Sequence, residues 1–549
     1  MSDDALSRRA FVGVSAAIAA GVLEKSPASR ALFNDAPRST PNAPRAAPLD
    51  DLTIVDLEAG LQSGKYTARS LVEQYTARIE ELDKRGPVLN HIIELNPDAL
   101  TIADQRDAER KAGKPLGSLH GIPILIKDNI DTADRMHTSA GSLALAASTP
   151  ARDSWVAERL RAAGAIILGK TNLSEWANIR STHSSSGWSG RGGQGKNPYA
   201  LDRNTSGSSS GSGGAVAASY CAAAIGSETD GSVTSPSAAC GLVGIKPTVG
   251  LIGRSGIIPI AHSQDTAGPM TRTVRDAAIM LGALTGLDPR DNATKASAGM
   301  SFTNYTRFLD AGGLRGARIG VARETFMGYS PKTDKLVEQA IDVFKQSGAT
   351  VVDPSNLPGI TKIGDAELEV LLYELKADLN AYLASLGPAA PVKTLADVIR
   401  FNEQNASREM PYFGQELFEQ AQKKGPLTDA KYKAARAKCI RLARTEGIDS
   451  VMTKHRLDAL VAPTQGPVWL IDLVSGDCGG GGGSFTQPAA IAGYPHITVP
   501  MGLVHGLPVG LSFVGRAWSE PMLFKLAYVY EQASKARKPP TFAATVTLS

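Results

Sequence analysis

The sequence predicts an α/β fold in which a mixed β-sheet forms the core and helices flank it. Two short apolar runs, residues 122–127 and 165–170, are bounded by Gly or Pro and each ends in a lysine, a pattern typical of buried strands. The segment between them, residues 154–163, has its apolar residues at helical spacing. Strand, helix and strand therefore alternate, which favours a layered fold of sheet and helices.

The remaining elements extend this pattern. Apolar residues recur at helical spacing from Leu57 to Leu82, with Thr67 in the position of an N-cap, so a pair of outer helices is expected. Residues 288–448 are richer in charge and predict a largely helical insertion, with long helical patterns at 334–346 and 366–386. Further strands are expected at residues 317–321, 350–352, 459–462, 497–500 and 509–514.

The amino terminus has the features of an export signal. Arg8 and Arg9 precede an uncharged run of 14 residues, which is shorter than the ~20 residues needed to span a membrane. The S-R-R-x-F pattern is similar to a twin-arginine signal, so we expect a periplasmic or secreted protein; a frayed amphipathic tail is the alternative. The predicted organisation is a signal peptide (1–31), a linker (32–50), one domain (51–540, containing the insertion) and a C-terminal tail (541–549).

Composition excludes several classes of protein. The 58 Lys and Arg residues against 54 Asp and Glu give a net charge of +4, too small a surplus to predict a nucleic-acid partner. No stretch after the signal reaches 18 uninterrupted apolar residues, so no stable membrane insertion is expected. There is no C-x-x-C or H-E-x-x-H motif, so neither a metal nor another cofactor is predicted. Two disulfides are possible, without a predicted pairing, among Cys221, Cys240, Cys439 and Cys478.

Gly and Ser residues cluster in two places. Residues 205–214 have the composition of a flexible linker, but a good helix start follows at residues 215–218. Residues 225–232 then repeat the combination of hydroxyl side chains and a Gly-rich turn. Two such loops on either side of a short helix indicate a structured pair.

These motifs resemble those of the amidase-signature hydrolases. In that family a Gly/Ser-rich loop supplies a serine held by a cis peptide bond, and a nucleophilic serine follows 24 residues later. The spacing of Ser208 and Ser232 is the same here, and the resemblance places the catalytic lysine at Lys127. Residues 169–172 and 244–248 match as well, so the resemblance covers nearly the whole chain after the signal. It implies the amidase-signature fold and a Ser-Ser-Lys triad.

The chemistry of these residue types supports the same roles. A serine hydroxyl needs a base, and a lysine is a base only when it is neutral, which burial favours. Lys127 follows a run of Ile and Leu, so desolvation is expected; the alternative is a lysine that extends from a strand end to solvent. We expect Ser208 to relay a proton between Ser232 and Lys127. The backbone N–H groups of Thr229, Asp230 and Gly231 are candidates for the oxyanion hole.

One other serine chemistry is an alternative to this one, and a second is excluded. Residues 207–211 match the G-x-S-x-G nucleophile elbow, which would make Ser209 the nucleophile. However, an elbow should follow a strand, and residues 197–205 are polar and turn-like. The S-x-x-K pattern is absent, since no serine has a lysine three residues later.

The substrate class is predicted by resemblance within the family. Residues 172–178 and 186–194 resemble the bacterial peptide amidase branch, which implies hydrolysis of the C-terminal amide of peptides with release of ammonia. An amidase for small aliphatic, aryl or fatty amides is the alternative. The family also contains a cytoplasmic component of a tRNA amidotransferase, against which the export signal argues. An exported, non-catalytic binding protein on the same fold is a further alternative. It would need a broken triad, and the three triad residues are intact in this sequence. The predicted partner is thus a small-molecule or peptide amide.

Overall fold

The computed structural model describes residues 49–114, 116–388, 390–478 and 484–548. The predicted signal peptide, and the linker up to residue 48, lie outside this part of the chain. The described residues contain an eleven-stranded mixed sheet and a two-stranded ribbon, β4 (Trp188–Ser189) with β5 (Gly193–Gln194). The large sheet has the order β1 (Ile92–Leu95), β3 (Ile166–Thr171), β2 (Pro123–Lys127), β6 (Ala223–Glu228), β8 (Thr266–Thr271), β7 (Val243–Lys246), β12 (His496–Val504), β13 (Leu507–Val514), β11 (Ala459–Pro463), β9 (Arg318–Val321) and β10 (Thr350–Val352).

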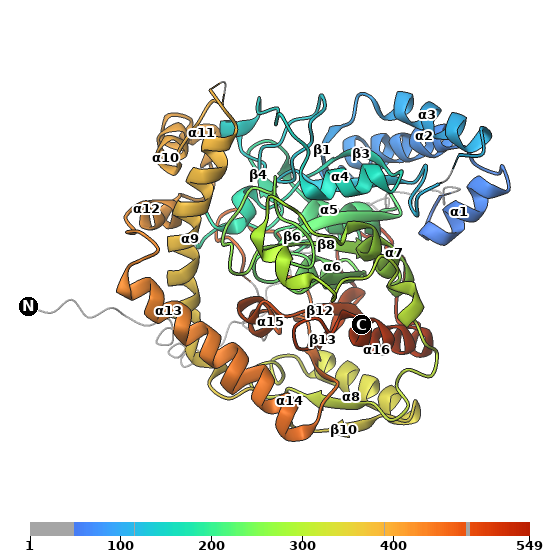
Figure 1. The fold of residues 1–549 in the computed structure, drawn as a ribbon, viewed down its shortest axis with the longest axis vertical. Coiled ribbons are helices and arrows are strands. Elements are labelled where there is room, and N and C mark those ends of the chain that lie inside the picture. The colour runs from blue at the N-terminus through green and yellow to red at the C-terminus, as the bar shows by residue number, and fades with distance from the viewer. Residues whose placement is uncertain (1–48, 115, 389, 479–483, 549) are drawn as a thin grey trace, which may run out of the picture. The chain divides into compact units, whose positions relative to one another are not determined.

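Helices flank this sheet, as Figure 1 shows. The short turns are π-helical at η1 (Glu80–Lys84) and η7 (Arg441–Ile448), and 3-10 at η2 (Leu143–Leu145), η3 (Glu175–Asn178), η4 (Asn292–Ser297), η5 (Thr306–Phe308) and η6 (Ile360–Lys362). The α-helices are α1 (Ile54–Gln62), α2 (Ala68–Ile79), α3 (Ala99–Lys111), α4 (Trp155–Ala162), α5 (Ser210–Ala217), α6 (Thr234–Ala239), α7 (Val274–Leu284), α8 (Pro331–Gln346), α9 (Gly364–Ser385), α10 (Leu395–Gln404), α11 (Ala406–Glu409), α12 (Glu416–Gln422), α13 (Ala430–Ile440), α14 (Asp449–His455), α15 (Gln487–Ala492) and α16 (Glu520–Ser534).

The predicted fold class is confirmed, and each strand and helix expected from an apolar pattern is present. Thr67 caps α2 as expected, its side chain accepting from the Ser70 N–H. Between residues 288 and 448 most elements are helical, and α9 to α13 lie together along one side of the view in Figure 1. The strands β9 and β10 within this segment pair with each other, and β9 also pairs with β11, so part of the segment extends the main sheet.

The Gly/Ser-rich segment is a buried helix, because α5 already begins at Ser210. Its glycines allow other parts of the chain to approach the helix closely. A Cβ at Gly211 would lie 2.4 Å from the Asn172 carbonyl oxygen and 2.6 Å from that of His91. The composition of a linker therefore reflects tight backbone packing here.

Gly211→Ala is expected to lower the free energy of unfolding by about 1–3 kcal/mol or more, since backbone atoms would have to move to admit a methyl group. Gly364→Ala is the matched control. Gly364 is the first residue of α9, and its added Cβ would meet nothing within 4 Å. Urea unfolding of both variants checks this expectation. Equal free energies of unfolding for the two variants would contradict the expected cost of a methyl group at Gly211.

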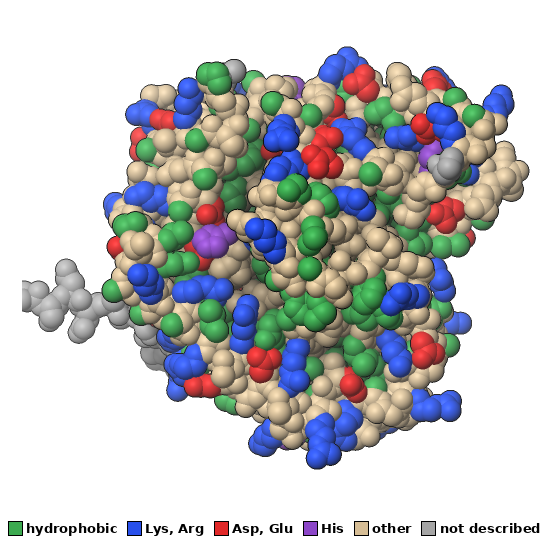
Figure 2. Space-filling view, viewed as in Figure 1, with side chains coloured by type: hydrophobic (Ala, Val, Ile, Leu, Met, Phe, Trp, Pro, Cys, Tyr) green, Lys and Arg blue, Asp and Glu red, His purple; other side chains and the backbone are tan. Residues whose placement is uncertain are grey.

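The surface carries charges of both signs. Figure 2 shows Lys and Arg side chains spread over one face and interspersed with acidic ones. Within the described residues, no helix has both the length and the apolarity required to cross a membrane. Cys221, Cys240 and Cys439 are buried free thiols and Cys478 is an exposed one, so the disulfides considered from composition are not formed.

Candidate active site

The position of Lys127 follows from the topology of the sheet. Strand β2 is parallel to β6, with Ile126 paired to Ile225, so the carboxyl ends of both strands meet at one edge. Lys127 is the last residue of β2 and is fully buried. Burial lowers the pKa of Lys127 to about 7, against the opposing effect of the carboxylates of Asp265 and Glu228. A substantial fraction of this amine is therefore neutral near pH 7.

Three oxygen atoms surround the Lys127 amine. Its Nζ lies 3.2 Å from the main-chain oxygen of Ser227 and 3.0 Å from Ser227 Oγ. It also lies 2.8 Å from Ser208 Oγ. A neutral amine has two N–H groups and one lone pair. Donation of both N–H groups to Ser227 leaves the lone pair facing Ser208, so the Ser208 hydroxyl can donate to it.

The loop that carries Ser208 is held by its main chain. The Gly207–Ser208 peptide bond is cis, as the resemblance implied. The Ser208 carbonyl oxygen accepts from the Ser174 N–H at 3.0 Å, and the Ser208 side chain is buried while lining a cavity. The hydroxyl can therefore contact both Lys127 and a molecule bound in that cavity.

Ser209, the nucleophile of the alternative elbow motif, has a different environment. Its Oγ donates to the Ser227 carbonyl oxygen at 3.1 Å and accepts from the Ser227 N–H at 3.2 Å. The side chain is fully buried, and its hydroxyl is used by the backbone of β6. Among the described residues, no hydrogen bond joins a histidine to Ser208, Ser209 or Ser232. The geometry thus gives the elbow interpretation no base.

Ser232 lies in the turn between β6 and α6. Glu228 closes this turn, because its Oε2 accepts from the N–H groups of Val233 (2.8 Å) and Thr234 (2.9 Å). Gly231 has φ of +75°, and a Cβ there would lie 2.8 Å from Ser235 Oγ, so the turn requires glycine. The Ser209 N–H donates to the Ser232 carbonyl oxygen at 3.1 Å, which joins the two loops. No hydrogen bond between the side chains of Ser208 and Ser232 is present among the described residues.

The N–H groups of Thr229, Asp230 and Gly231 have no acceptor among the described loop and side-chain hydrogen bonds. The side chain of Thr229 is fixed, since its Oγ1 donates to Asp265 Oδ1 at 2.6 Å. Asp265 also accepts from two backbone N–H groups, and burial raises its pKa to about 6. A turn with free N–H groups and a held side chain suits the binding of a developing negative oxygen.

A cavity of about 400 Å³ opens beside Ser208 and Thr229. One wall is the loop of residues 254–260, with three isoleucines, and the other is one face of α9, formed by Asp378, Ala381, Tyr382 and Ser385. Asp131 connects both walls: its Oδ1 accepts from the Tyr382 hydroxyl at 2.8 Å, and its N–H donates to the Gly256 carbonyl oxygen at 2.8 Å. A larger, more open groove of about 650 Å³ elsewhere contains none of the predicted site residues.

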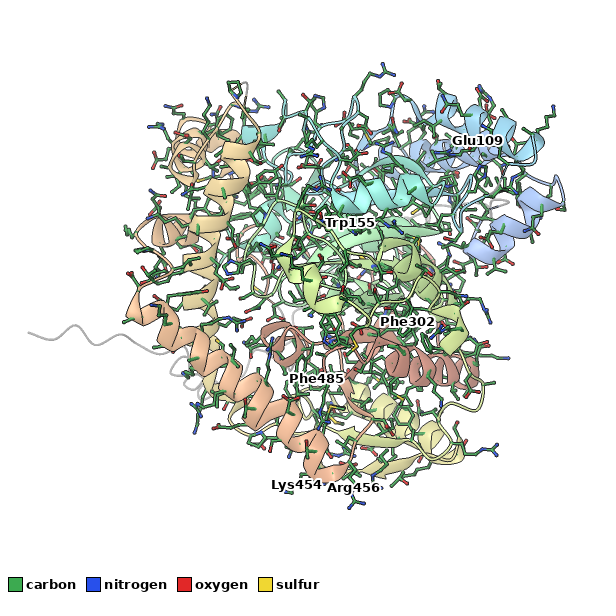
Figure 3. The ribbon with its side chains drawn as sticks, viewed as in Figure 1. Glu109, Trp155, Phe302, Lys454, Arg456 and Phe485 are labelled. Atoms are coloured by element: carbon green, nitrogen blue, oxygen red, sulfur yellow. The ribbon has the colours of Figure 1, made fainter. Side chains whose placement is uncertain are left out.

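The first wall is anchored to α4. The N–H of Trp155, labelled in Figure 3 at the start of this helix, donates to the Ser255 carbonyl oxygen at 3.0 Å. The Trp155 indole donates to the Leu284 carbonyl oxygen at 2.9 Å, which fixes α4 to α7. This wall of the cavity is therefore held by α4, which is itself fixed to α7.

A charged cluster lies at the mouth of the cavity. His262 Nδ1 donates to Asp378 Oδ2 at 2.8 Å and lies 3.5 Å from Glu374 Oε2. The hydrogen bond to Asp378 raises the pKa of His262. These three residues are the one group among the described residues whose metal-ligating atoms lie within 4.8 Å of one another. His262 Nδ1 is already hydrogen-bonded to Asp378. The cluster therefore acts as an ion pair between the loop that carries His262 and α9.

Several residues of the site are not predicted by the sequence patterns. Ser227 lies within residues 225–232, and Asn129 follows Lys127 by two residues; the proximity of Ser227 to Lys127 follows from the pairing of β2 with β6. Asn129 Nδ2 donates to Ser227 Oγ at 2.9 Å. Gln264 and Asp265 precede β8, a strand that no apolar pattern marks, and only the sheet register brings them to the turn after β6.

Comparison with known proteins identifies the family of this chain. The family model described as Amidase matches residues 70–524. A probable amidase from Arabidopsis thaliana is 42% identical over 505 residues, which cover 90% of this chain and 92% of the relative. One component of the glutamyl-tRNA(Gln) amidotransferase of Chloroflexus aurantiacus is 35% identical over 503 residues, 89% of this chain and 97% of the relative.

Solved structures extend the similarity to the fold. The native peptide amidase from Stenotrophomonas maltophilia is 49% identical, with a TM-score of 0.86 over 90% of this chain and 99% of that chain. A peptide amidase in complex with the competitive inhibitor chymostatin is 50% identical, with a TM-score of 0.87 over 90% of this chain and 100% of that chain. This chain therefore belongs to the amidase family, as its Gly/Ser-rich motifs predicted, and is an amide-hydrolysing enzyme.

Proposed function

We propose that this amidase hydrolyses the C-terminal carboxamide of peptides through an acyl-enzyme on Ser232, with Ser208 and Lys127 as proton relay and base. The observation that carries the proposal is the 2.8 Å contact between the buried Lys127 amine and Ser208 Oγ. A buried amine with a pKa of about 7 can take up a proton at neutral pH, whereas an exposed lysine cannot.

In the proposed reaction, Ser232 Oγ attacks the carboxamide carbon. Its proton passes to Ser208 Oγ while Ser208 gives its own proton to Lys127. The carbonyl oxygen becomes negative and is stabilised by the N–H groups of Thr229, Asp230 and Gly231. The proton then returns from Lys127 through Ser208 to the nitrogen, and ammonia leaves. Water, deprotonated by the same relay, hydrolyses the acyl-enzyme to the carboxylic acid and frees Ser232.

The cavity supports a peptide as the acyl group. Its volume of about 400 Å³ exceeds the needs of a small aliphatic amide, and it has an apolar loop wall and a polar mouth. The structurally similar peptide amidases strengthen this assignment. Broader activity on aryl or fatty amides is the second candidate, because the isoleucines of residues 257–260 would also accept an apolar chain.

Ammonia release from a matched panel tests the substrate class. The panel contains amidated dipeptides, the same dipeptides as free acids, a fatty amide, an aryl amide and glutamine. We expect kcat/KM to be highest for the amidated dipeptides, with no ammonia from the free acids. Preference for the fatty or aryl amide would favour the second candidate, and no hydrolysis of any amide would contradict the proposal.

Ala381→Trp is expected to separate large from small substrates. Ala381 lines the cavity from α9, so an indole there would reduce the space for the acyl group. We expect KM for an amidated dipeptide to rise by about tenfold or more, a loss of roughly 1.4 kcal/mol in binding, while acetamide turnover changes little. Ala384→Trp is the matched control, since Ala384 is an exposed residue of the same helix and does not line the cavity. Equal effects of both changes would contradict this assignment of the wall.

We also propose that the protein is exported through its twin-arginine motif. The support is the S-R-R-x-F sequence at residues 7–11, ahead of a short uncharged run. Replacement of Arg8 and Arg9 by lysine is expected to retain the protein in the cytoplasm, because a receptor reads the arginine pair. Cell fractionation measures this, and full export of the lysine variant would contradict it.

A further inference from the structure

Gln264 contacts the backbone of the turn that precedes Ser232. It lies two residues before β8, and the antiparallel register pairs Glu228 of β6 with Thr266 of β8, so Gln264 is placed beside the turn. Its Nε2 donates to the Thr229 carbonyl oxygen at 3.2 Å and to Glu367 Oε1 at 3.0 Å. Both N–H groups of this buried amide are therefore used.

Glu367 of α9 determines which way the Gln264 amide faces. A carboxyl group accepts from an amide N–H, and Oε2 of Glu367 accepts from Gln487 Nε2 at 2.7 Å. Each oxygen of Glu367 thus accepts from one amide, and the nitrogen of Gln264, not its oxygen, faces the carboxyl group. The same nitrogen then reaches Thr229.

The contact at Thr229 fixes the orientation of one peptide group. In a trans peptide the C=O and the N–H point in opposite directions. Donation from Gln264 to the Thr229 carbonyl oxygen therefore directs the Asp230 N–H away from Gln264, and this N–H has no acceptor among the described hydrogen bonds. The donated hydrogen bond also polarises the peptide, which strengthens its N–H as a donor.

We propose that Gln264 is a positioning residue for the oxyanion hole: held by Glu367, it orients the Thr229–Asp230 peptide so that the Asp230 N–H can bind the negative oxygen of the transition state. This inference rests on the proposed function, because it assumes attack by Ser232. It connects the cavity helix α9 to the reaction through two buried side chains.

The test compares an amidated dipeptide with its thioamide. Sulfur accepts hydrogen bonds poorly, so an intact oxyanion hole favours the oxygen substrate. In the thioamide reaction, serine adds to the C=S carbon, ammonia leaves, and water releases a thiocarboxylic acid, so ammonia release under single-turnover conditions reports both substrates. For Gln264→Met we expect kcat on the amide to fall by about 10- to 100-fold with little change in KM. The amide-to-thioamide rate ratio should fall by about fivefold or more.

Two further variants make the result specific. Gln415→Met is the matched control: Gln415 is also buried and donates to a main-chain oxygen, that of Ile399, at 3.2 Å, but it lies outside the site. It should leave the rate ratio unchanged. Glu367→Gln preserves the shape of the side chain and should lower the ratio in the same direction, which keeps the test open if Gln264→Met does not fold.

An amide-to-thioamide rate ratio that is unchanged in both Gln264→Met and Glu367→Gln would overturn this inference. Both rates would then have changed by the same factor. Ser232→Ala, measured alongside, separates it from the proposed function. If Ser232→Ala still releases ammonia, the proposed function fails whatever the ratios show. If Ser232→Ala is inactive and the ratios are unchanged, only the role of Gln264 fails.

Discussion

Ser232→Ala is expected to reduce ammonia release from an amidated dipeptide by at least about three orders of magnitude, because no acyl-enzyme can form without the hydroxyl. The fold should persist, since the Ser232 side chain makes no hydrogen bond among the described residues and Glu228 closes the turn through the main chain of Val233 and Thr234. Kinetics on purified protein, with circular dichroism and thermal unfolding, measure both expectations.

Ser209→Ala is the informative comparison for this result. Ser209 holds Ser227, which in turn contacts Lys127, so a reduced rate is expected without complete loss. If Ser232→Ala kept substantial activity while Ser209→Ala were inactive, the elbow interpretation would replace the one proposed here.

Lys127→Met is expected to slow amide turnover by several orders of magnitude, because it removes the base and leaves Ser208 with no proton acceptor. For the wild-type enzyme, kcat/KM should rise with pH as the Lys127 amine loses its proton, with an apparent pKa near 7, and stay high at mildly alkaline pH. Protonation of Asp265, whose pKa is about 6, would weaken its hydrogen bond with Thr229 and steepen the acid side of the pH profile.

The stability of Lys127→Met distinguishes lost chemistry from misfolding. The folded pKa of Lys127 lies below its ordinary value of 10.5, so between about pH 7 and 10.5 the unfolded chain binds the extra proton. The free energy of unfolding of the wild type therefore rises with pH through that range. Below about pH 7 the full cost of burying a charged amine is present. The methionine variant lacks this penalty and should be at least as stable as wild type at pH 7. A variant with near-normal amide kinetics, or one that is simply unfolded, would contradict this account.

The sequence patterns predict the parts of the fold in which apolar residues are continuous. Strands β2 and β3 are apolar runs buried along their whole length, and both are expected from those runs. Strands β6 and β8 are not expected from apolar runs, because Ala223–Glu228 is rich in small residues and Thr266–Thr271 contains Gly and Pro. These strands lie where α5 packs closely, so side-chain bulk is replaced by backbone contact.

The candidate site likewise contains residues that the sequence predicts and residues that only the structure identifies. Lys127, Ser208 and Ser232 lie in motifs with a recognisable spacing, so they could be named from the sequence. Gln264 and Tyr382 could not, because their roles depend on contacts between distant residues; Tyr382 bonds Asp131 across 251 positions of the chain. Only the register of the sheet and the packing of α9 bring such residues together.

The most direct measurement of the central claim is the location of the acyl group during turnover. An activated ester of the preferred dipeptide is mixed with enzyme near pH 5, where a protonated Lys127 slows deacylation, and the reaction is quenched in acid. Peptide mapping by mass spectrometry then locates the added acyl mass. We expect one acyl group per chain on Ser232, located by fragmentation of the peptide that contains it, and none in Ser232→Ala. Acyl mass on Ser209, or on a histidine, with Ser232 unmodified, would contradict it.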